Sequence, residues 1–177
     1  KKQCGALNTM KAETNLIIVG GGGHAKVVAE CARAADLAIA GFTDKVSSQK
    51  MLDYSYLGTD EWLTSQNPKN FSLSIGVGHT KDGSIRMTLF KKLKELGFNF
   101  AILQHPSSVV APSVTLGEGC QIMAGAILQP SIRIGTNVII NTAAVIEHDV
   151  TIEDGCHIAP GAVIGGGVQI GTLSLVG

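Results

Sequence analysis

The sequence has no net charge and few aromatic residues. Its 177 residues contain 14 Lys and Arg against 14 Asp and Glu, and only 5% of them are Phe, Trp or Tyr. Nucleic-acid-binding proteins usually carry a basic patch, often with aromatic residues among the basic ones. The sequence has neither feature, so we expect no nucleic-acid partner.

A hydrophobic run of membrane-spanning length is also missing. About twenty consecutive apolar residues are needed to cross a bilayer, and residues 1–15 contain no apolar core of a signal peptide. We therefore expect a cytoplasmic protein without a membrane span. Residues 1–14 are interpreted as a disordered leader or an artificial remnant, with Met10 as a candidate for the natural start.

The sequence is rich in glycine and in a six-residue repeat. An aliphatic residue occupies every sixth position from Val110 to Val176, and a small or compact residue follows four places later in most repeats. A period of six fits neither an amphipathic helix nor a long alternating strand. It is typical of a parallel β-solenoid. The aliphatic series is Val110, Leu116, Ile122, Leu128, Ile134, Ile140, Ile146, Ile152, Ile158, Ile164, Ile170 and Val176.

Three hexapeptides would form one triangular coil, so that residues eighteen apart stack about 4.8 Å from each other. The aliphatic residue and the one four places later would then point inward. Cys120 and Cys156 occupy equivalent inward positions two coils apart, roughly 10 Å, which is beyond the reach of a disulfide. We interpret them as core residues. No CxxC pair or Cys/His cluster is present, so we expect no metal site.

The first hundred residues alternate between strand-like and helix-like segments. This alternation predicts a small parallel sheet with helices packed on it. The expected strands are residues 16–19, 39–43, 71–77 and 98–103, and the expected helices are 25–35, 58–65 and 84–96.

A run of four glycines follows the first expected strand. Gly20, Gly22 and Ala25 fit the dinucleotide fingerprint G-x-G-x-x-G/A, and Asp44 lies about twenty residues further on, where an acid that binds a ribose is expected. The segment is too short for two mononucleotide halves, so we predict a half-site for a nucleotide diphosphate, with positive φ at Gly22. The alternative is a tight turn in which glycine only saves space. His24 would face the ligand or cap its helix.

One histidine of the repeat region has unusual flanks. His148 follows the inward Ile146 by two places and therefore projects outward, between Glu147 and Asp149. A carboxylate that accepts one ring N–H fixes the tautomer and raises the basicity of the other nitrogen. The alternative is an inert surface histidine.

The hexapeptide pattern resembles the left-handed β-helix acyltransferases. The run from Ile140 to Asp149 is similar to the active-site coil of the family of sialic-acid O-acetyltransferases and bacterial nucleotide-sugar N-acetyltransferases. The resemblance implies a fold of the class α/β plus all-β, in which a small Rossmann-like nucleotide-sugar-binding domain (15–105) precedes a left-handed parallel β-helix (106–177). It also implies that His148 is the general base and Asp149 its helper.

The same resemblance implies the binding residues. The nucleotide sugar would be held by Gly22, Gly23, His24, Asp44, Lys45 and Gly78. Acetyl-CoA, the co-substrate, would be bound by His157 and by the Gly165–Gly167 corner with Gly166 at its centre. Relatives continue for another coil, whereas this sequence stops in mid-repeat at Gly177, so we expect it to be truncated.

These patterns and the resemblance together predict an acetyl-CoA-dependent N-acetyltransferase. Its substrate would be a nucleotide-linked amino-dideoxy sugar for surface-glycan biosynthesis, and a homotrimer would cover the bare faces of the prism. Three alternatives stay open. They are a sialic-acid O-acetyltransferase, a solenoid that binds without catalysing, and a nicotinamide-dependent oxidoreductase.

Overall fold

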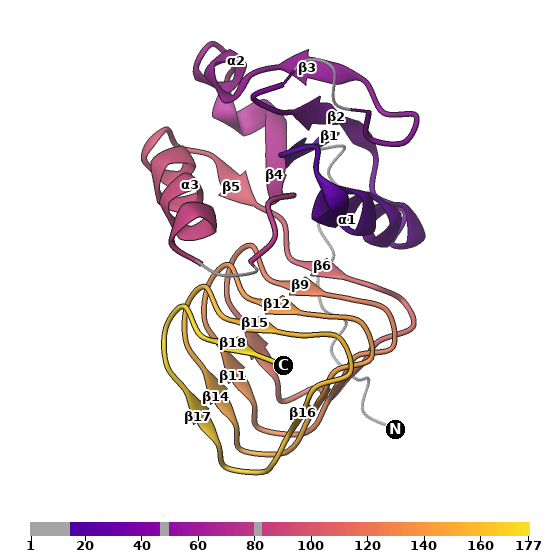
Figure 1. The fold of residues 1–177 in the computed structure, drawn as a ribbon, viewed down its shortest axis with the longest axis vertical. Coiled ribbons are helices and arrows are strands. Elements are labelled where there is room, and N and C mark those ends of the chain that lie inside the picture. The colour runs from indigo at the N-terminus through magenta and orange to yellow at the C-terminus, as the bar shows by residue number, and fades with distance from the viewer. Residues whose placement is uncertain (1–14, 47–49, 80–82) are drawn as a thin grey trace, which may run out of the picture.

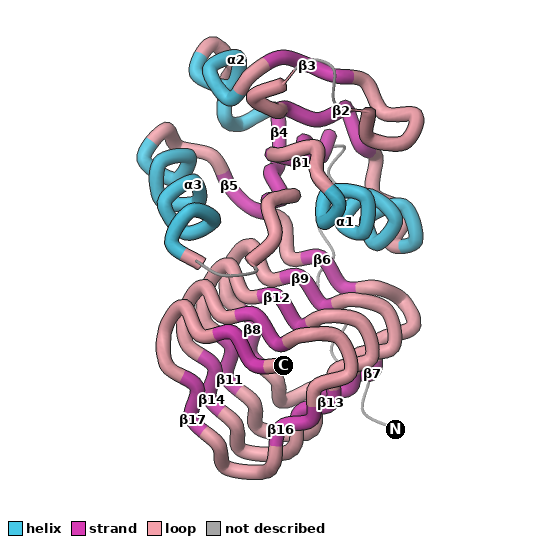
Figure 2. The backbone as a smooth tube through the Cα atoms, viewed as in Figure 1, coloured by secondary structure: helices cyan, strands magenta, loops and turns pink. Residues whose placement is uncertain are grey.

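The N-terminal α/β domain lies against one face of a three-sided parallel β-helix (Figure 1). The structure, a computed structural model, describes residues 15–46, 50–79 and 83–177. The predicted leader, with Met10 and Cys4, lies outside the described residues. Figure 2 shows that the helices belong to the N-terminal domain, whereas short strands and turns make up the solenoid.

The N-terminal sheet is parallel and has five strands in the order β3-β2-β1-β4-β5. From β1 the chain adds β2 and then β3 on one side of β1. It then crosses to the other side of β1, where it adds β4 and β5. The neighbours β1 and β4 therefore form a topological switch point, where open α/β sheets bind ligands. The bounds are β1 (Asn15–Val19), β2 (Ile39–Thr43), β3 (Tyr56–Gly58), β4 (Phe71–Ile75) and β5 (Asn99–Phe100).

Helices cover both faces of this sheet. Leu16 and Ile18 pack against one helix, and the alternating Ile17 and Val19 pack on the side of another. The first helix is rich in alanine on its buried face, which allows a close approach to the sheet. The helices are α1 (Gly23–Ala34), which lies on the Leu16 side, α2 (Asp60–Thr64), the short 3-10 helix η1 (Pro68–Asn70) and α3 (Ser84–Glu95), which lies on the Ile17 side.

Two segments differ from the sequence prediction. Tyr56–Gly58 forms a fifth strand, and the ring of Tyr56 packs against that of Phe42, whose centroid is 5.6 Å away. The strand expected over 98–103 is divided, because β6 (Leu103–Gln104) already pairs with the solenoid. The domain boundary after residue 105 remains a prediction, and the first solenoid strand begins two residues before that point.

The solenoid has three sheets, which we name by what their outer faces carry. The domain-facing sheet contains β6, β9 (Gln121–Ile122), β12 (Ile139–Ile140), β15 (His157–Ile158) and β18 (Leu175–Val176). The apolar-faced sheet contains β7 (Val109–Val110), β10 (Ile127–Leu128), β13 (Val145–Ile146) and β16 (Val163–Ile164). The polar-faced sheet contains β8 (Thr115–Leu116), β11 (Arg133–Ile134), β14 (Thr151–Ile152) and β17 (Gln169–Ile170).

The predicted eighteen-residue stacking is confirmed. Leu116 pairs with Ile134, which pairs with Ile152. The inward positions form one continuous core that includes both Cys120 and Cys156, and these thiols are free and buried. The α/β domain followed by a parallel three-sheet β-helix is therefore the fold that the sequence predicts.

No helix in the described part of the chain is long and apolar enough to cross a membrane. Within the same residues, no group of three His, Cys, Asp or Glu side chains could hold a metal ion.

Candidate functional site

Two glycines at the switch point are required by the fold itself. Gly20, directly after β1, has a φ of 105°, and a Cβ atom there would stand 3.0 Å from Val77 Cγ2. A Cβ atom on Gly76, directly after β4, would stand 2.7 Å from the carbonyl oxygen of Gly20. These two positions let the ends of β1 and β4 approach each other.

Gly22 and Gly23 have no such internal reason. A Cβ atom on either would meet nothing within 4 Å, and Gly22 has a φ of −76°. The prediction of positive φ at Gly22 is therefore wrong. The residue of the turn with a positive φ is Gly20. Gly22 is the N-cap of α1 and supplies no side-chain cap. The glycine pair leaves the space beside the N-terminus of α1 empty, which the space-saving interpretation does not explain.

Asp44 stabilises the turn formed by residues 20–23, which we call the glycine turn. Gly21 N–H donates to its Oδ2 over 2.6 Å, and Val46 N–H donates to its Oδ1 over 2.9 Å. Both carboxylate oxygens thus accept a backbone hydrogen bond, and the acid holds the turn in place. Contact of Asp44 with a ribose stays a prediction.

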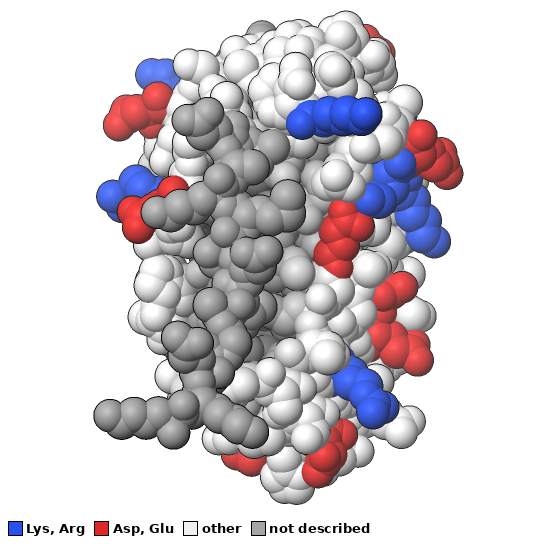
Figure 3. Space-filling model, turned by 180° about the vertical axis from the view of Figure 1, so that it is seen from behind, with Lys and Arg blue, Asp and Glu red and all other residues white. Residues whose placement is uncertain are grey.

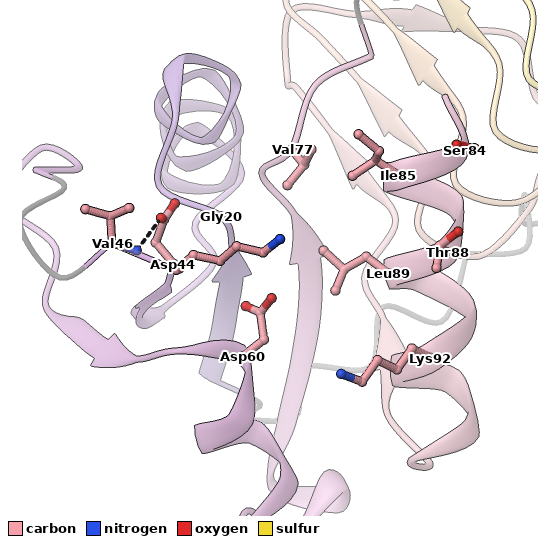
Figure 4. A pocket seen from close by; sticks show the side chains of 11 residues that line it. Gly20, Asp44, Val46, Asp60, Val77, Ser84, Ile85, Thr88, Leu89 and Lys92 are labelled. Atoms are coloured by element: carbon pink, nitrogen blue, oxygen red, sulfur yellow. Dashed lines mark hydrogen bonds between the residues drawn. The ribbon is translucent and has the colours of Figure 1, made fainter. Parts of the chain in front are cut away.

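A pocket of about 660 Å³ opens between the ends of the strands and α3 (Figure 4). Val77, Ile85 and Leu89 give it an apolar wall. The charged residues Asp44, Lys45, Asp60 and Lys92 also line it.

Asp60 and Lys92 were not among the predicted site residues. Asp60 begins α2, where Thr43 Oγ1 donates to its Oδ1 over 2.9 Å, and Lys92 belongs to α3. They reach the pocket because both helices pack at this edge of the sheet (Figure 4). No local motif marks either residue, so only the tertiary arrangement reveals them.

His24 connects the glycine turn to the solenoid rather than capping its helix. Its Nε2 lies 2.8 Å from Gln121 Oε1 on β9, and a Cβ atom on Gly78 would lie 3.3 Å from His24 Cβ. The pKa of His24 is lowered from 6.5 to about 4, mainly by burial and secondly by the nearby Arg86 cation. The imidazole is therefore neutral around pH 7.

Arg86 lies buried beneath the loop that follows β4. Its Nη1 donates to Ile75 O over 2.7 Å and to Val77 O over 2.9 Å. Burial lowers the pKa of this guanidinium to about 9, so it keeps its charge at neutral pH. Arg86 holds the loop against α3, and the sequence prediction missed it because its spacing is that of an ordinary helical arginine.

His157 lies on the domain-facing sheet and bonds within its own chain through both ring nitrogens. Nδ1 is 2.8 Å from His79 O, which can only accept, so Nδ1 carries the proton. Nε2 is 2.9 Å from Asn141 Nδ2. Burial lowers the pKa of His157. His157 is thus not an idle surface histidine, and its contact with CoA stays a prediction.

His148 lies in the turn between β13 and β14, at another corner of the coil. Its Nδ1 is 2.8 Å from Asp149 Oδ2, and the side chains are 63% and 65% exposed. A carboxylate accepts, so in the neutral ring Nδ1 carries the proton and Nε2 has the lone pair. Gly166 stacks next to the ring, where a Cβ atom would lie 2.8 Å from Nε2.

The predicted site residues therefore form two groups in one chain. The glycine turn, Asp44, Lys45, His24 and Gly78 gather around the switch point, and His157 lies nearby on the domain-facing sheet. His148, Asp149 and Gly166 lie where the apolar-faced and polar-faced sheets meet.

Two family models match the chain. The PglD N-terminal domain matches residues 15–93. The bacterial transferase hexapeptide (six repeats) matches residues 113–148 and 131–166.

Solved structures match over most of the chain. A mutant of perosamine N-acetyltransferase from Caulobacter crescentus, in complex with CoA and GDP-perosamine, is 36% identical with a TM-score of 0.85, covering 93% of this chain and 77% of that one. The chain belongs to the PglD-type family of hexapeptide-repeat nucleotide-sugar N-acetyltransferases. The acetyltransferase domain of PglB from Neisseria gonorrhoeae FA1090, in complex with acetyl coenzyme A, is 34% identical with a TM-score of 0.87, covering 93% of this chain and 79% of that one.

A curated family member matches over a shorter stretch. UDP-N-acetylbacillosamine N-acetyltransferase from Bacillus subtilis (strain 168) is 37% identical in an alignment of 121 residues that covers 62% of this chain and 51% of that protein. The match thus spans about half the length of the curated relative. The family predicted from the hexapeptides and the coil around His148 is confirmed.

Proposed function

We propose that this PglD-type protein transfers the acetyl group of acetyl-CoA to the amino group of a nucleotide-linked amino-dideoxy sugar for surface-glycan biosynthesis. The observation that carries the proposal is the open N-terminus of α1 beside a pocket, on a chain that also presents an oriented His148–Asp149 pair. The relatives that contain CoA with GDP-perosamine, or acetyl coenzyme A, support it.

The nucleotide diphosphate fits the switch point. Backbone N–H groups at the N-terminus of α1 attract phosphate, and the missing side chains at Gly22 and Gly23 allow close approach. The pocket beside it offers an apolar wall for a base, with Asp44, Lys45 and Asp60 for polar groups. Binding of the nucleotide sugar by Gly22, Gly23, His24, Asp44, Lys45 and Gly78 is part of this proposal.

The chemistry assigned to His148 is general-base catalysis. As the sugar amine attacks the thioester carbonyl, the new C–N bond forms, His148 Nε2 takes the amine proton and a backbone N–H stabilises the oxyanion. The C–S bond then breaks and CoA leaves as a thiolate, which can take the proton from His148. A covalent intermediate is not required. Cys156 is a poor nucleophile because burial raises its pKa.

The apolar-faced sheet supports a homotrimer. Its outward ladder is Val109, Ile127, Val145 and Val163, all β-branched and apolar, and Val109 and Val163 are 62% and 70% exposed. Cyclic symmetry would cover three such faces with one another. We expect sedimentation equilibrium to give three chains and Val145→Lys to dissociate them; an active monomeric wild type would contradict this arrangement.

Assembly would also complete the catalytic site. His148 belongs to the turn that follows β13 of the apolar-faced sheet, away from the domain-facing sheet of its own chain. A neighbouring copy would place its own nucleotide site and His157 near this corner. Acetyl-CoA would lie in the groove between copies, along His157 and Gly166. We expect this assembly in the cytoplasm, a reducing compartment that suits the free thiols Cys31, Cys120 and Cys156.

A thiol-release assay tests the proposed function. Acetyl-CoA would be offered with UDP- and GDP-linked amino sugars, with free sialic acid and with buffer. We expect thiol release only with a nucleotide amino sugar, because a free sugar lacks the nucleotide that would bind in the pocket at the switch point. Release only with sialic acid would support the O-acetyltransferase alternative. A change in NADH absorbance with the same sugars would support the oxidoreductase alternative.

A further inference from the structure

Gln121 is a solenoid residue whose side chain points into the N-terminal domain. It lies on β9, is completely buried and bonds to the end of β4 and to the start of α1. Its Nε2 donates to Ser74 Oγ over 2.9 Å and to Ile75 O over 2.8 Å, both at the end of β4. Its Oε1 lies 2.8 Å from His24 Nε2 at the start of α1.

These bonds fix the orientation of the Gln121 amide. A backbone carbonyl can only accept a hydrogen bond, so the group that faces Ile75 O must be the NH₂ end. The opposite orientation would place two acceptors 2.8 Å apart inside the protein, which is unfavourable. The carbonyl end of Gln121 must therefore face His24.

The orientation of Gln121 in turn fixes the tautomer of His24. Because Gln121 Oε1 accepts, His24 Nε2 must donate and carries the ring proton. The neutral ring then has its lone pair on Nδ1. This atom has no hydrogen-bond partner among the residues that the structure describes, and it is not fully buried. Burial disfavours a second proton on the His24 ring most strongly, and the charge of Arg86 on α3 adds to this effect. The hydrogen bond to Gln121 of β9 opposes it, and His157 of β15 makes the smallest contribution, which again disfavours the proton.

A neutral imidazole with an open lone pair cannot serve as a phosphate ligand. Both the Nδ1 atom and phosphate oxygens are acceptors, so they repel each other. The partner of Nδ1 must be a donor, such as an O–H or N–H group. His24 contacts the solenoid through Gln121 and is not among the residues that line the pocket between Gly20 and α3. With the base and the diphosphate assigned to the pocket and the N-terminus of α1, the part of a nucleotide sugar left to contact His24 is its sugar.

We infer that Gln121 is a positioning residue that holds His24 as a hydrogen-bond acceptor for a hydroxyl or amino group of the sugar. This inference rests on the proposed function for the identity of the ligand. It gives the solenoid a part in substrate recognition, because a strand of the β-helix determines what the N-terminal domain accepts. The nucleotide diphosphate itself stays with the α1 terminus and the pocket.

The tautomer can be measured directly by ¹⁵N NMR of the imidazole rings in the assembled protein. We expect the wild type to show His24 protonated on Nε2 and not on Nδ1, and Gln121→Met to lose this preference. Ser74→Ala is the matched control, because it removes one bond of Gln121 but leaves those to Ile75 O and His24. A wild-type His24 protonated on Nδ1 would overturn the inference, whatever the enzyme's substrate.

Binding experiments identify the part of the substrate that His24 contacts. We expect Gln121→Met to weaken binding of the nucleotide amino sugar about tenfold, the typical effect of one misdirected buried hydrogen bond. The Kd of UDP or GDP and the KM of acetyl-CoA should stay unchanged. Equal weakening of the nucleoside diphosphate would assign the donor to the nucleotide and contradict the inference. Absence of thiol release by the wild type with every nucleotide amino sugar would contradict the proposed function but leave the tautomer result intact.

Discussion

Gly166 stacks on the ring of His148, so closely that a Cβ atom at position 166 would lie 2.8 Å from both Nε2 and Cε1 of the imidazole. The absence of a side chain at Gly166 therefore leaves room for the nitrogen that the proposed mechanism uses as the base. A methyl group there would rotate the ring and disturb its bond to Asp149, which fixes the tautomer.

Gly166→Ala should lower kcat by about ten- to a hundredfold, the effect expected when a reacting group is displaced by a fraction of an ångström to one ångström. Stability should change little because Gly166 is exposed and has no positive φ. Steady-state kinetics with a melting curve would test both points. Gly171→Ala is the control, since a Cβ atom there meets nothing within 4 Å. Equal kcat in the two variants would show that the space around His148 is unimportant.

His148→Ala should lower kcat by roughly 10²–10⁴-fold, the usual contribution of a general base. Assembly should persist, because the side chain is exposed and lies outside the core. The deficit should narrow at alkaline pH, where more of the amine is already deprotonated. Asp149→Asn should cause a smaller loss, since an amide oxygen can still accept the Nδ1 proton. A neutral-pH rate equal to that of the wild type would remove His148 from the mechanism.

Gly22→Val should raise the KM for the nucleotide sugar by at least tenfold and leave the KM for acetyl-CoA nearly unchanged. The added side chain would occupy the empty space beside the N-terminus of α1, where the proposal places a phosphate. The fold should tolerate it because Gly22 is extended and has no close neighbours. Initial-rate kinetics with each substrate varied in turn would separate the two constants. A parallel rise in both would mean that the glycine turn does not bind the nucleotide sugar.

Acidification should destabilise the protein through His24. Its folded pKa of about 4 lies below the value of 6.5 taken for the unfolded chain, so the unfolded state binds the proton first and stability falls as the pH drops from about 6.5 to 4. The full shift corresponds to about 3 kcal/mol. Urea unfolding at several pH values should show this slope, and His24→Gln should flatten it. Some pH dependence of stability should remain in this variant, because burial also lowers the pKa of His157. An equal slope in the variant would exclude His24 as the cause.

The solenoid could be predicted from the sequence in detail because its structure is local and repetitive. Each hexad needs the same inward pair, so the register of Leu116, Ile134 and Ile152 follows from spacing alone. The N-terminal strands and helices were also visible, from alternation and from the glycine turn. Tyr56–Gly58 was missed because a three-residue edge strand carries too little pattern to be distinguished from a loop.

The candidate site could be predicted only where a local motif marks it. Gly22, Asp44 and His148 stand in motifs, and their parts in binding and catalysis remain predictions. Spacing could not show that Asp44 holds the backbone of the turn or that both nitrogens of His157 are engaged. Gln121 and Arg86 look like ordinary strand and helix residues. Their importance comes from the packing of the solenoid against the N-terminal domain, which no short stretch of sequence encodes.

The outward ladder of the domain-facing sheet fixes the distance between Gln121 and His157. Gln121, Ile139 and His157 occupy the same position in successive coils, so the first and last are two strand spacings apart, about 10 Å. Because hydrogen-bonded strands set this distance, changes in the turns cannot adjust it gradually. It can change only in whole-coil steps of about 4.8 Å. Deletion of one eighteen-residue coil between Gln121 and His157 would therefore shorten the measured span by one step while leaving each ladder intact.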